Sequence, residues 1–265
     1  RTLIKTAGDP QPAAGLTIAR QLAEALAAAW NDSFPLRQVE RFESWPIADR
    51  RIKASADSLR TAGNLALGRN GLATALHEWR ESYRRSAQIG DSAGMGATLG
   101  NIGAGYYQSN ELDSADHYLT RARAIAEPIR DWRTAGNAVG TLAEIQSDRG
   151  ALGRAADLYT LAADIRSRTG DARGAAADRN NLGLIAGQLG DLRRARLAFD
   201  SALASNRAAG RDEPAAANLI NLGNLSSLEG DYPQADARYR EALALYRAHG
   251  NRVDAASVLR ALGLL

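Results

Sequence analysis

One pattern of residue types recurs every 40 residues along most of this chain, and it constrains the fold more than any other feature. The first column of the pattern holds a small residue in each unit: Gly63, Gly103, Ala143, Gly183, Gly223 and Gly263. Sixteen residues later each complete unit has a large apolar residue: Trp79, Leu119, Tyr159, Phe199 and Tyr239. The register holds without insertion or deletion. A fixed period of this length is typical of a solenoid made of stacked supersecondary units.

Each unit has the pattern of two helices, which the fifth unit shows clearly. Its first stripe has the i, i+3, i+4, i+7 spacing of one helix face: Leu219, Leu222, Gly223 and Ser226. Gly230 and Asp231 interrupt this stripe, and a second helical stripe with Ala235 and Tyr239 follows. The small side chains at positions 223 and 235 predict a close approach of the two helices, with Tyr239 filling the space beside them. The sequence therefore predicts an all-α chain of helix pairs.

Two short segments of the chain carry a family resemblance: Asn180-Asn181-Leu182-Gly183 and Asn221-Leu222-Gly223-Asn224. Together with the glycine break and the alanine followed by an aromatic residue, they resemble the tetratricopeptide (TPR) signature in a form with a 40-residue period. They are similar to the repeats of kinesin light chains and spindle-orientation adaptors, and to bacterial TPR arrays that precede CHAT protease domains. The resemblance covers residues 56–265. It implies a right-handed superhelical solenoid of antiparallel helix pairs.

The period divides the chain into three regions. Residues 56–255 contain five 40-residue TPR units, and residues 256–265 begin a sixth unit that is truncated. Residues 1–55 lie outside the period and predict an N-terminal helical cap segment, in which residues 1–11 are loose. We expect one helix from Gly15 to Trp30, a second from Pro35 to Ser44, and a third that starts at Pro46 and runs into the first unit. Alternatively, this segment lies in the groove of the solenoid or swaps onto a second molecule.

The composition excludes several kinds of chemistry. The chain has no Cys and only three His, so it has no disulfides, no thiolate metal sites and no cysteine nucleophile. Its net charge of +3 is too small an excess to indicate a nucleic-acid-binding face. It also lacks the run of about 18 apolar residues that a membrane-spanning helix needs. We therefore expect no enzymatic activity, no cofactor, no metal, no nucleic-acid partner and no membrane partner, with the cytoplasm as the default location.

Polar side chains beside the core stripe of the first helices predict a partner-binding groove, because these helices line the concave face of such a solenoid. The predicted groove residues are Arg60, Asn64, Asn101, Tyr107, Asn137, Glu144, Asn180, Asn181, Gln188, Asn221 and Asn224. An Asn side chain offers both a donor and an acceptor, so a ladder of Asn residues can bind the backbone of an extended peptide. Alternatively, these side chains tie neighbouring helices together across the stack. Because the groove mixes Arg60 with Glu144, a ligand of mixed or basic charge fits better than a purely acidic one.

These features predict a non-catalytic module for protein or peptide interaction. It binds an extended segment in the concave groove and forms the regulatory arm of a larger bacterial protein, for which the resemblance implies a CHAT protease as one effector. The alternative is a structural scaffold whose repeat ends stack on each other. Its contact is the apolar C-terminal end with Leu262, Leu264 and Leu265, which predicts a homo-oligomer. The partner in either case is a protein or a peptide.

Overall fold

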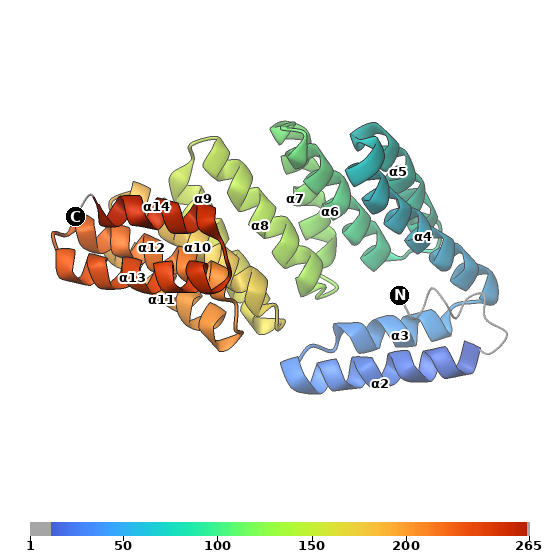
Figure 1. Ribbon diagram of the computed structural model, residues 1–265. Helices are drawn as coiled ribbons and strands as arrows, with labels where there is room; N and C mark the ends of the chain where they lie inside the picture. Colours follow the sequence, from blue (N-terminus) through green and yellow to red (C-terminus); the bar gives the residue numbers. More distant parts are fainter. Residues whose placement is uncertain (1–11, 264–265) are drawn as a thin grey trace. The chain divides into compact units, whose positions relative to one another are not determined.

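The computed structural model describes residues 12–263, and every regular element in that range is an α-helix (Figure 1). The helices are α2 (Pro12–Trp30), α3 (Phe34–Ser44), α4 (Ile47–Asn70), α5 (Leu72–Gln88), α6 (Ser92–Gln108), α7 (Leu112–Ala126), α8 (Trp132–Asp148), α9 (Leu152–Arg168), α10 (Ala172–Gln188), α11 (Leu192–Ala208), α12 (Asp212–Leu228), α13 (Tyr232–Ala248) and α14 (Arg252–Leu262). The all-α prediction is confirmed. The predictions for residues 1–11, Leu264 and Leu265 lie outside the described residues.

The helices form two compact units. The first contains α2 to α7, most of α8 and the turn residues 168–170; the second contains nearly all of α9 and the helices α10 to α14. Within the first unit α4 packs on α5 and α6 packs on α7; within the second, α10 packs on α11 and α12 packs on α13. The helices α6, α8, α10, α12 and α14 begin at 40-residue intervals, as the sequence period predicts.

The close approach predicted inside each helix pair is confirmed in both units. A Cβ atom added to Gly223 in α12 would lie 2.6 Å from Cε1 of Tyr239 in α13. A Cβ atom added to Gly103 in α6 would lie 2.6 Å from Cγ of Leu119 in α7. Real Cβ atoms do not approach other heavy atoms so closely, so glycine at positions 103 and 223 is what allows the large apolar residue 16 positions later to fill the contact.

The turns between repeats are closed by backbone geometry and by side-chain caps. Gly210 and Gly250 have φ of +63° and +67°, a conformation that glycine adopts without steric cost. In the sequence an Asp or Asn follows most of these turns, a residue type that favours capping or shaping the turn. Asp171 and Asn251 each accept a hydrogen bond from the backbone N–H three residues later, which confirms capping there. Asp91 makes no such bond; its buried carboxylate lies 3.0 Å from Nζ of Lys53 instead.

The N-terminal segment forms the three helices expected from the sequence, with α4 continuous into the first repeat. Val39 and Phe42 of α3 are buried. Arg37 Nη2 donates to the carbonyl oxygen of Ile129 at 3.1 Å, and Arg41 Nη2 donates to that of Gly90. The helix α3 therefore contacts the turns that follow α5 and α7, an attachment that the sequence did not indicate.

Candidate functional site

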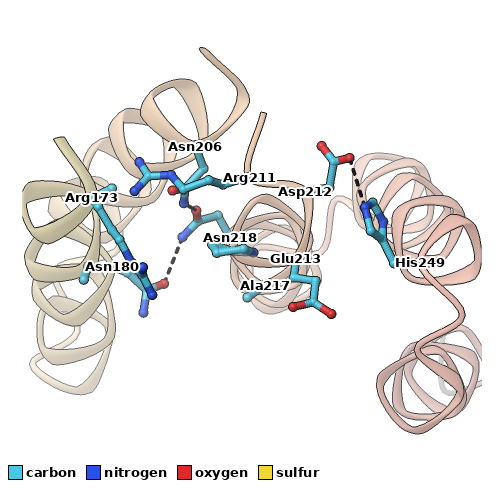
Figure 2. Close-up of a pocket in the computed structure, with 12 residues that line it drawn as sticks. Arg173, Asn180, Asn206, Arg211, Asp212, Glu213, Ala217, Asn218 and His249 are labelled. Atoms are coloured by element: carbon cyan, nitrogen blue, oxygen red, sulfur yellow. Dashed lines mark hydrogen bonds and ion pairs between the residues drawn. The ribbon is translucent and has the colours of Figure 1, made fainter. Parts of the chain in front are cut away.

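The second unit contains a cavity of about 620 Å³ (Figure 2). Its walls come from the first half of α10, the end of α11, the start of α12 and the residue that follows α13. The lining residues are Arg173, Ala176, Ala177, Asn180, Asn206, Arg211, Asp212, Glu213, Pro214, Ala217, Asn218 and His249. This volume lies within the range of about 300–1,000 Å³ that is usual for small-ligand sites in proteins. The alanines leave space between the helices, and the longer polar side chains surround it.

A chain of hydrogen-bonded asparagines crosses the wall of this cavity. Asn206 at the end of α11 and Asn218 in α12 are 4% and 2% exposed. Asn206 Nδ2 donates to Asn218 Oδ1 at 2.7 Å, and Asn218 Nδ2 donates to Asn180 Oδ1 at 2.9 Å. Asn221 Nδ2 donates to the same oxygen of Asn180 at 3.0 Å. Buried amides need such partners, because an unpaired one costs about 1–3 kcal/mol.

These hydrogen bonds determine which end of the Asn180 amide is available to a ligand. Its Oδ1 accepts two hydrogen bonds, which is the full capacity of a carbonyl oxygen. Its two N–H donors make no hydrogen bond with the described residues. Asn180 is half-buried on α10 and lines the cavity. The amide therefore offers donors, and not acceptors, to whatever enters the cavity.

Two arginines line the same cavity as Asn180 (Figure 2). Arg173 in the first turn of α10 is exposed and makes no hydrogen bond or ion pair with the described residues. Arg211 directly precedes α12; its Nη2 donates to the carbonyl oxygen of Ala172 at 3.3 Å. Its Nε is buried and has no hydrogen-bond partner in the described part of the chain. Guanidinium groups only donate hydrogen bonds, so both arginines bring donors to the cavity.

Acidic side chains line the other side of the cavity. Asp212 and Glu213 lie in the first turn of α12, where a negative charge is favoured by the helix dipole. His249 Nε2 is 3.5 Å from Asp212 Oδ2, and His249 Nδ1 is 3.0 Å from the carbonyl oxygen of Leu245. Glu213 is exposed and makes no ion pair with the described residues. Burial is the main cause of a raised pKa at Tyr246, and the charge of Glu213 contributes to it.

The first unit contains a shorter version of the asparagine contacts. Asn64 Oδ1 in α4 accepts from Trp79 Nε1 at 2.9 Å and from Asn101 Nδ2 in α6 at 2.7 Å. The buried Trp79 thereby has its indole N–H satisfied. Arg60, one turn before Asn64, lies 3.1 Å from Asp57 Oδ1. Asn64 therefore joins two successive first helices, as Asn180 does in the second unit.

The predicted groove residues divide between the two units. In the first unit are Arg60, Asn64, Asn101, Tyr107, Asn137 and Glu144; in the second are Asn180, Asn181, Gln188, Asn221 and Asn224. Hydrogen bonds join Asn64 to Asn101, and Asn221 to Asn180. Asn224 Oδ1 accepts from the hydroxyl of Tyr239 at 2.7 Å. Asn181 and Gln188 lie on α10 without hydrogen bonds to the described residues, and of the predicted set only Asn180 lines the cavity.

Sequence reasoning missed Asn206, Asn218, Arg173 and Arg211. A signal for the first two exists, because they are 12 residues apart in columns that hold alanine at 126 and 138. A polar pair replacing an apolar pair at a helix–helix contact predicts a buried hydrogen bond. Arg211 also has a signal: it occupies the turn column that elsewhere holds Asp or Asn. For Arg173 the sequence contains no comparable signal.

Among the residues that the structure describes, there is no cluster of three or more His, Asp or Glu side chains that could bind a metal ion. Nor does any described helix have the length and apolar character needed to cross a membrane. The candidate site is the cavity of the second unit, with the asparagine contacts that shape it.

Comparison with protein-family models and with curated proteins found no match. Solved structures do match. The crystal structure of BtubC (BKLC) from P. vanneervenii has a TM-score of 0.68 at 19% identity, over 95% of this chain and 93% of that chain. A STAND protein from Pyrococcus horikoshii with a tetratricopeptide repeat sensor, PH0952, has a TM-score of 0.67 at 14% identity, over 92% of this chain and 37% of that chain.

A third match gives the type of repeat most directly. The TPR-like repeats of a putative kinesin light chain from Podosopora anserina have a TM-score of 0.59 at 15% identity, over 74% of this chain and 96% of that chain. Identities this low establish the fold alone. They agree with the resemblance drawn from the repeat pattern. The chain folds as an array of TPR-type helical repeats.

Proposed function

We propose that this chain is a non-catalytic interaction module that binds an extended peptide segment along α10 and α12. The observation that carries this proposal is the cavity of the second unit, lined by Arg173, Asn180 and Glu213. It combines apolar space between helices with a few polar groups at its walls, which is the usual composition of a recognition site. TPR-type structural neighbours support an interaction role for the array.

The asparagine contacts support this proposal in a specific way. In each unit the oxygen of one Asn receives two hydrogen bonds within the fold, as Asn64 and Asn180 show. The ladder therefore joins successive helices, which is the structural role considered from the sequence. The same bonds hold the Asn180 amide in one orientation before a ligand arrives. A preorganised donor costs less entropy on binding than a mobile one.

The finer proposal is that the chain serves as the regulatory arm of a larger bacterial protein. The STAND protein PH0952 is described as having a tetratricopeptide repeat sensor, and this chain matches 37% of that protein. By this proposal, occupancy of the second unit is the signal that the arm transmits to an effector domain.

A scaffold function remains the second candidate, because Val253 and Leu259 of α14 are 78% and 48% exposed. Stacking of this end on a second copy predicts a molecular mass that rises with protein concentration. Replacement of Leu259 by Ser would abolish that rise. A concentration-independent monomer mass would reject this candidate.

Peptide selection tests the main proposal. A library of random linear dodecapeptides is displayed against the 265-residue chain, and the Kd of enriched peptides is measured by fluorescence anisotropy. The test variant is Asn181→Ala, because Asn181 is half-buried on α10 and makes no hydrogen bond with the described residues. The control is Asp200→Ala on the exposed surface of α11.

We expect Asn181→Ala to weaken binding about tenfold through loss of the hydrogen bond to the peptide backbone. The Asp200→Ala control should bind as the parent chain does. Failure to enrich any peptide, or equal binding by both variants and the parent, would reject the proposed groove.

A further inference from the structure

We propose that the cavity of the second unit selects a dipolar peptide segment, with a carboxylate held by Arg173, Asn180 and Arg211 and a cationic side chain held by Glu213. This inference rests on the proposed peptide-binding function and specifies its ligand. It departs from the sequence expectation in the residues that set the ligand's charge, since Arg173, Arg211 and Glu213 were not among the predicted groove residues.

The carboxylate assignment follows from the donors on one wall. The two N–H donors of Asn180 are unused, because its oxygen is occupied by Asn218 and Asn221. Arg173 makes no hydrogen bond or ion pair with the described residues, and Nε of Arg211 is buried without a partner. Arg211 lines the same cavity and forms no ion pair with the described residues, so its guanidinium group favours an anionic ligand. Three donor groups that line one cavity fit an anionic oxygen ligand.

The opposite wall excludes a strongly anionic ligand. Asp212 and Glu213 line the same cavity as the two arginines. A phosphate would bring close to two negative charges into a cavity that also contains both carboxylates, whereas a carboxylate brings one. Figure 2 shows Arg173 and Asn180 on one side of the view, with Asp212 and His249 on the other. The ligand's negative charge is therefore single and placed at the arginine side.

The cationic group of the ligand is inferred from the two acidic residues of the cavity, of which only one already lies beside a basic side chain. Asp212 is already beside His249, at 3.5 Å between Oδ2 and Nε2. Glu213 has no ion-pair partner among the described residues and is exposed at the cavity. A Lys or Arg side chain on the ligand would find an available carboxylate there. Recognition of both charges explains why one cavity contains two arginines and one glutamate that form no ion pair with the described residues.

Matched peptide libraries test this assignment with the full chain. All are N-acetylated, C-amidated nonapeptides whose remaining positions vary among uncharged residues. Each library has two fixed positions, separated by one to three residues. In four libraries these positions hold Glu and Lys, Glu and Gln, Gln and Lys, or Gln and Gln. A fifth carries Gln and Lys with a free C-terminal carboxylate. Retention on the chain is measured by affinity selection and mass spectrometry.

Two variants test the binding of the ligand's carboxylate and of its cationic group separately, and a third variant is the control. Arg173→Gln removes one cation from the carboxylate side, and Glu213→Gln removes the acid. Arg193→Gln makes the same change as the first variant on the exposed surface of α11, where Arg193 has no partner among the described residues. None of these side chains makes a hydrogen bond or an ion pair within the described chain, so each variant is expected to fold. Thermal unfolding checks this for each of them.

The parent chain should retain the Glu and Lys library about tenfold better than either library with one charge, since each ionic hydrogen bond contributes about that factor. Arg173→Gln should weaken the preference for Glu over Gln, because Asn180 and Arg211 remain, and should keep the preference for Lys. Glu213→Gln should do the reverse, and Arg193→Gln should keep both. If the fifth library matches the Glu and Lys library, the carboxylate comes from the end of a chain; if it does not, it comes from a side chain.

Two results would overturn the assignment in different ways. Equal retention of the four capped libraries, with loss of all four in Asn181→Ala, would refute the dipolar ligand and leave peptide binding intact. An unchanged preference for Glu in Arg173→Gln would likewise refute the carboxylate site. No retention of any library would reject the proposed function itself.

Discussion

The close packing of α6 on α7 gives a prediction with an internal reference, because two glycines of the same helix differ in what surrounds them. A Cβ at Gly103 would lie 2.6 Å from Cγ and 3.1 Å from the backbone nitrogen of Leu119. A Cβ at Gly100 would meet only Cβ of Ala122, at 4.0 Å. Both glycines lie in the middle of α6, so replacement by Ala brings each variant the same gain in helix propensity of about 1 kcal/mol.

The difference between the two variants therefore isolates the packing contact. Gly100→Ala should raise the free energy of unfolding by about 1 kcal/mol. Gly103→Ala adds an overpacking cost of about 1–3 kcal/mol, because the backbone of α7 has to move together with Leu119. Its net effect should be a loss of about 0–2 kcal/mol. The two variants should then differ by about 1–3 kcal/mol, with Gly103→Ala the less stable.

Thermal unfolding followed by circular dichroism at 222 nm measures this difference. For chains of this size 1 kcal/mol corresponds to about 2–4 °C in Tm, so the two midpoints should be separated by on the order of 5 °C. Native-state hydrogen exchange should localise the loss in Gly103→Ala to amides of α6 and α7, since repeats in a solenoid contact mainly their neighbours. Equal midpoints, or a higher midpoint for Gly103→Ala, would refute the argument that the contact with Leu119 requires glycine at position 103.

Three further predictions concern polar groups. Asn218→Ala leaves the buried amide of Asn206 without its acceptor, so urea unfolding should show a loss of about 1–3 kcal/mol; a loss below about 0.5 kcal/mol would contradict the buried chain. Asp191→Ala removes the cap on the backbone N–H of Arg194 and should cost about 1 kcal/mol, whereas Asp191→Asn should cost little; equal losses would show that charge and not capping matters. Burial raises the pKa of Asp131 above 3.8, so the folded state favours its protonated form. The contribution of the protonated carboxyl to the stability of the fold is complete below pH 3.8 and is lost as pH rises through the raised pKa. Asp131→Asn keeps an acceptor for the turn and should flatten the fall in stability above pH 3.8; a parallel pH profile would refute this.

The architecture could be predicted from the sequence because each repeat contains the residue types of the same helix–helix contact. A small residue at 223 and an aromatic residue at 239 have meaning together only if two helices touch there, and the period repeats that pair in each unit. The turn after α9 was predictable for a similar reason. Asp171 follows a glycine and precedes a helical stripe, which is the local pattern of a capping residue.

The candidate site was harder to predict, because it depends on residues that differ from the repeat pattern. Asn180 was identified from its place beside the core stripe, yet which of its two polar ends faces a ligand depends on Asn218. The direction of that bond depends in turn on the buried Asn206. A pattern of residue types contains no hydrogen-bond directions. Asp91 shows the same limit, since its carboxylate pairs with Lys53, which lies in α4 before the first repeat begins, and does not cap its own turn.

The central claim is that the polar cavity of the second unit receives a peptide, and a crystal structure of the chain with a selected peptide tests it most directly. The account predicts an extended segment along α10 and α12, with an oxygen of the peptide within hydrogen-bond distance of Asn180 Nδ2 and a carboxylate beside Arg173. A peptide bound elsewhere on the chain, with the Asn180 amide still open to solvent, would contradict it.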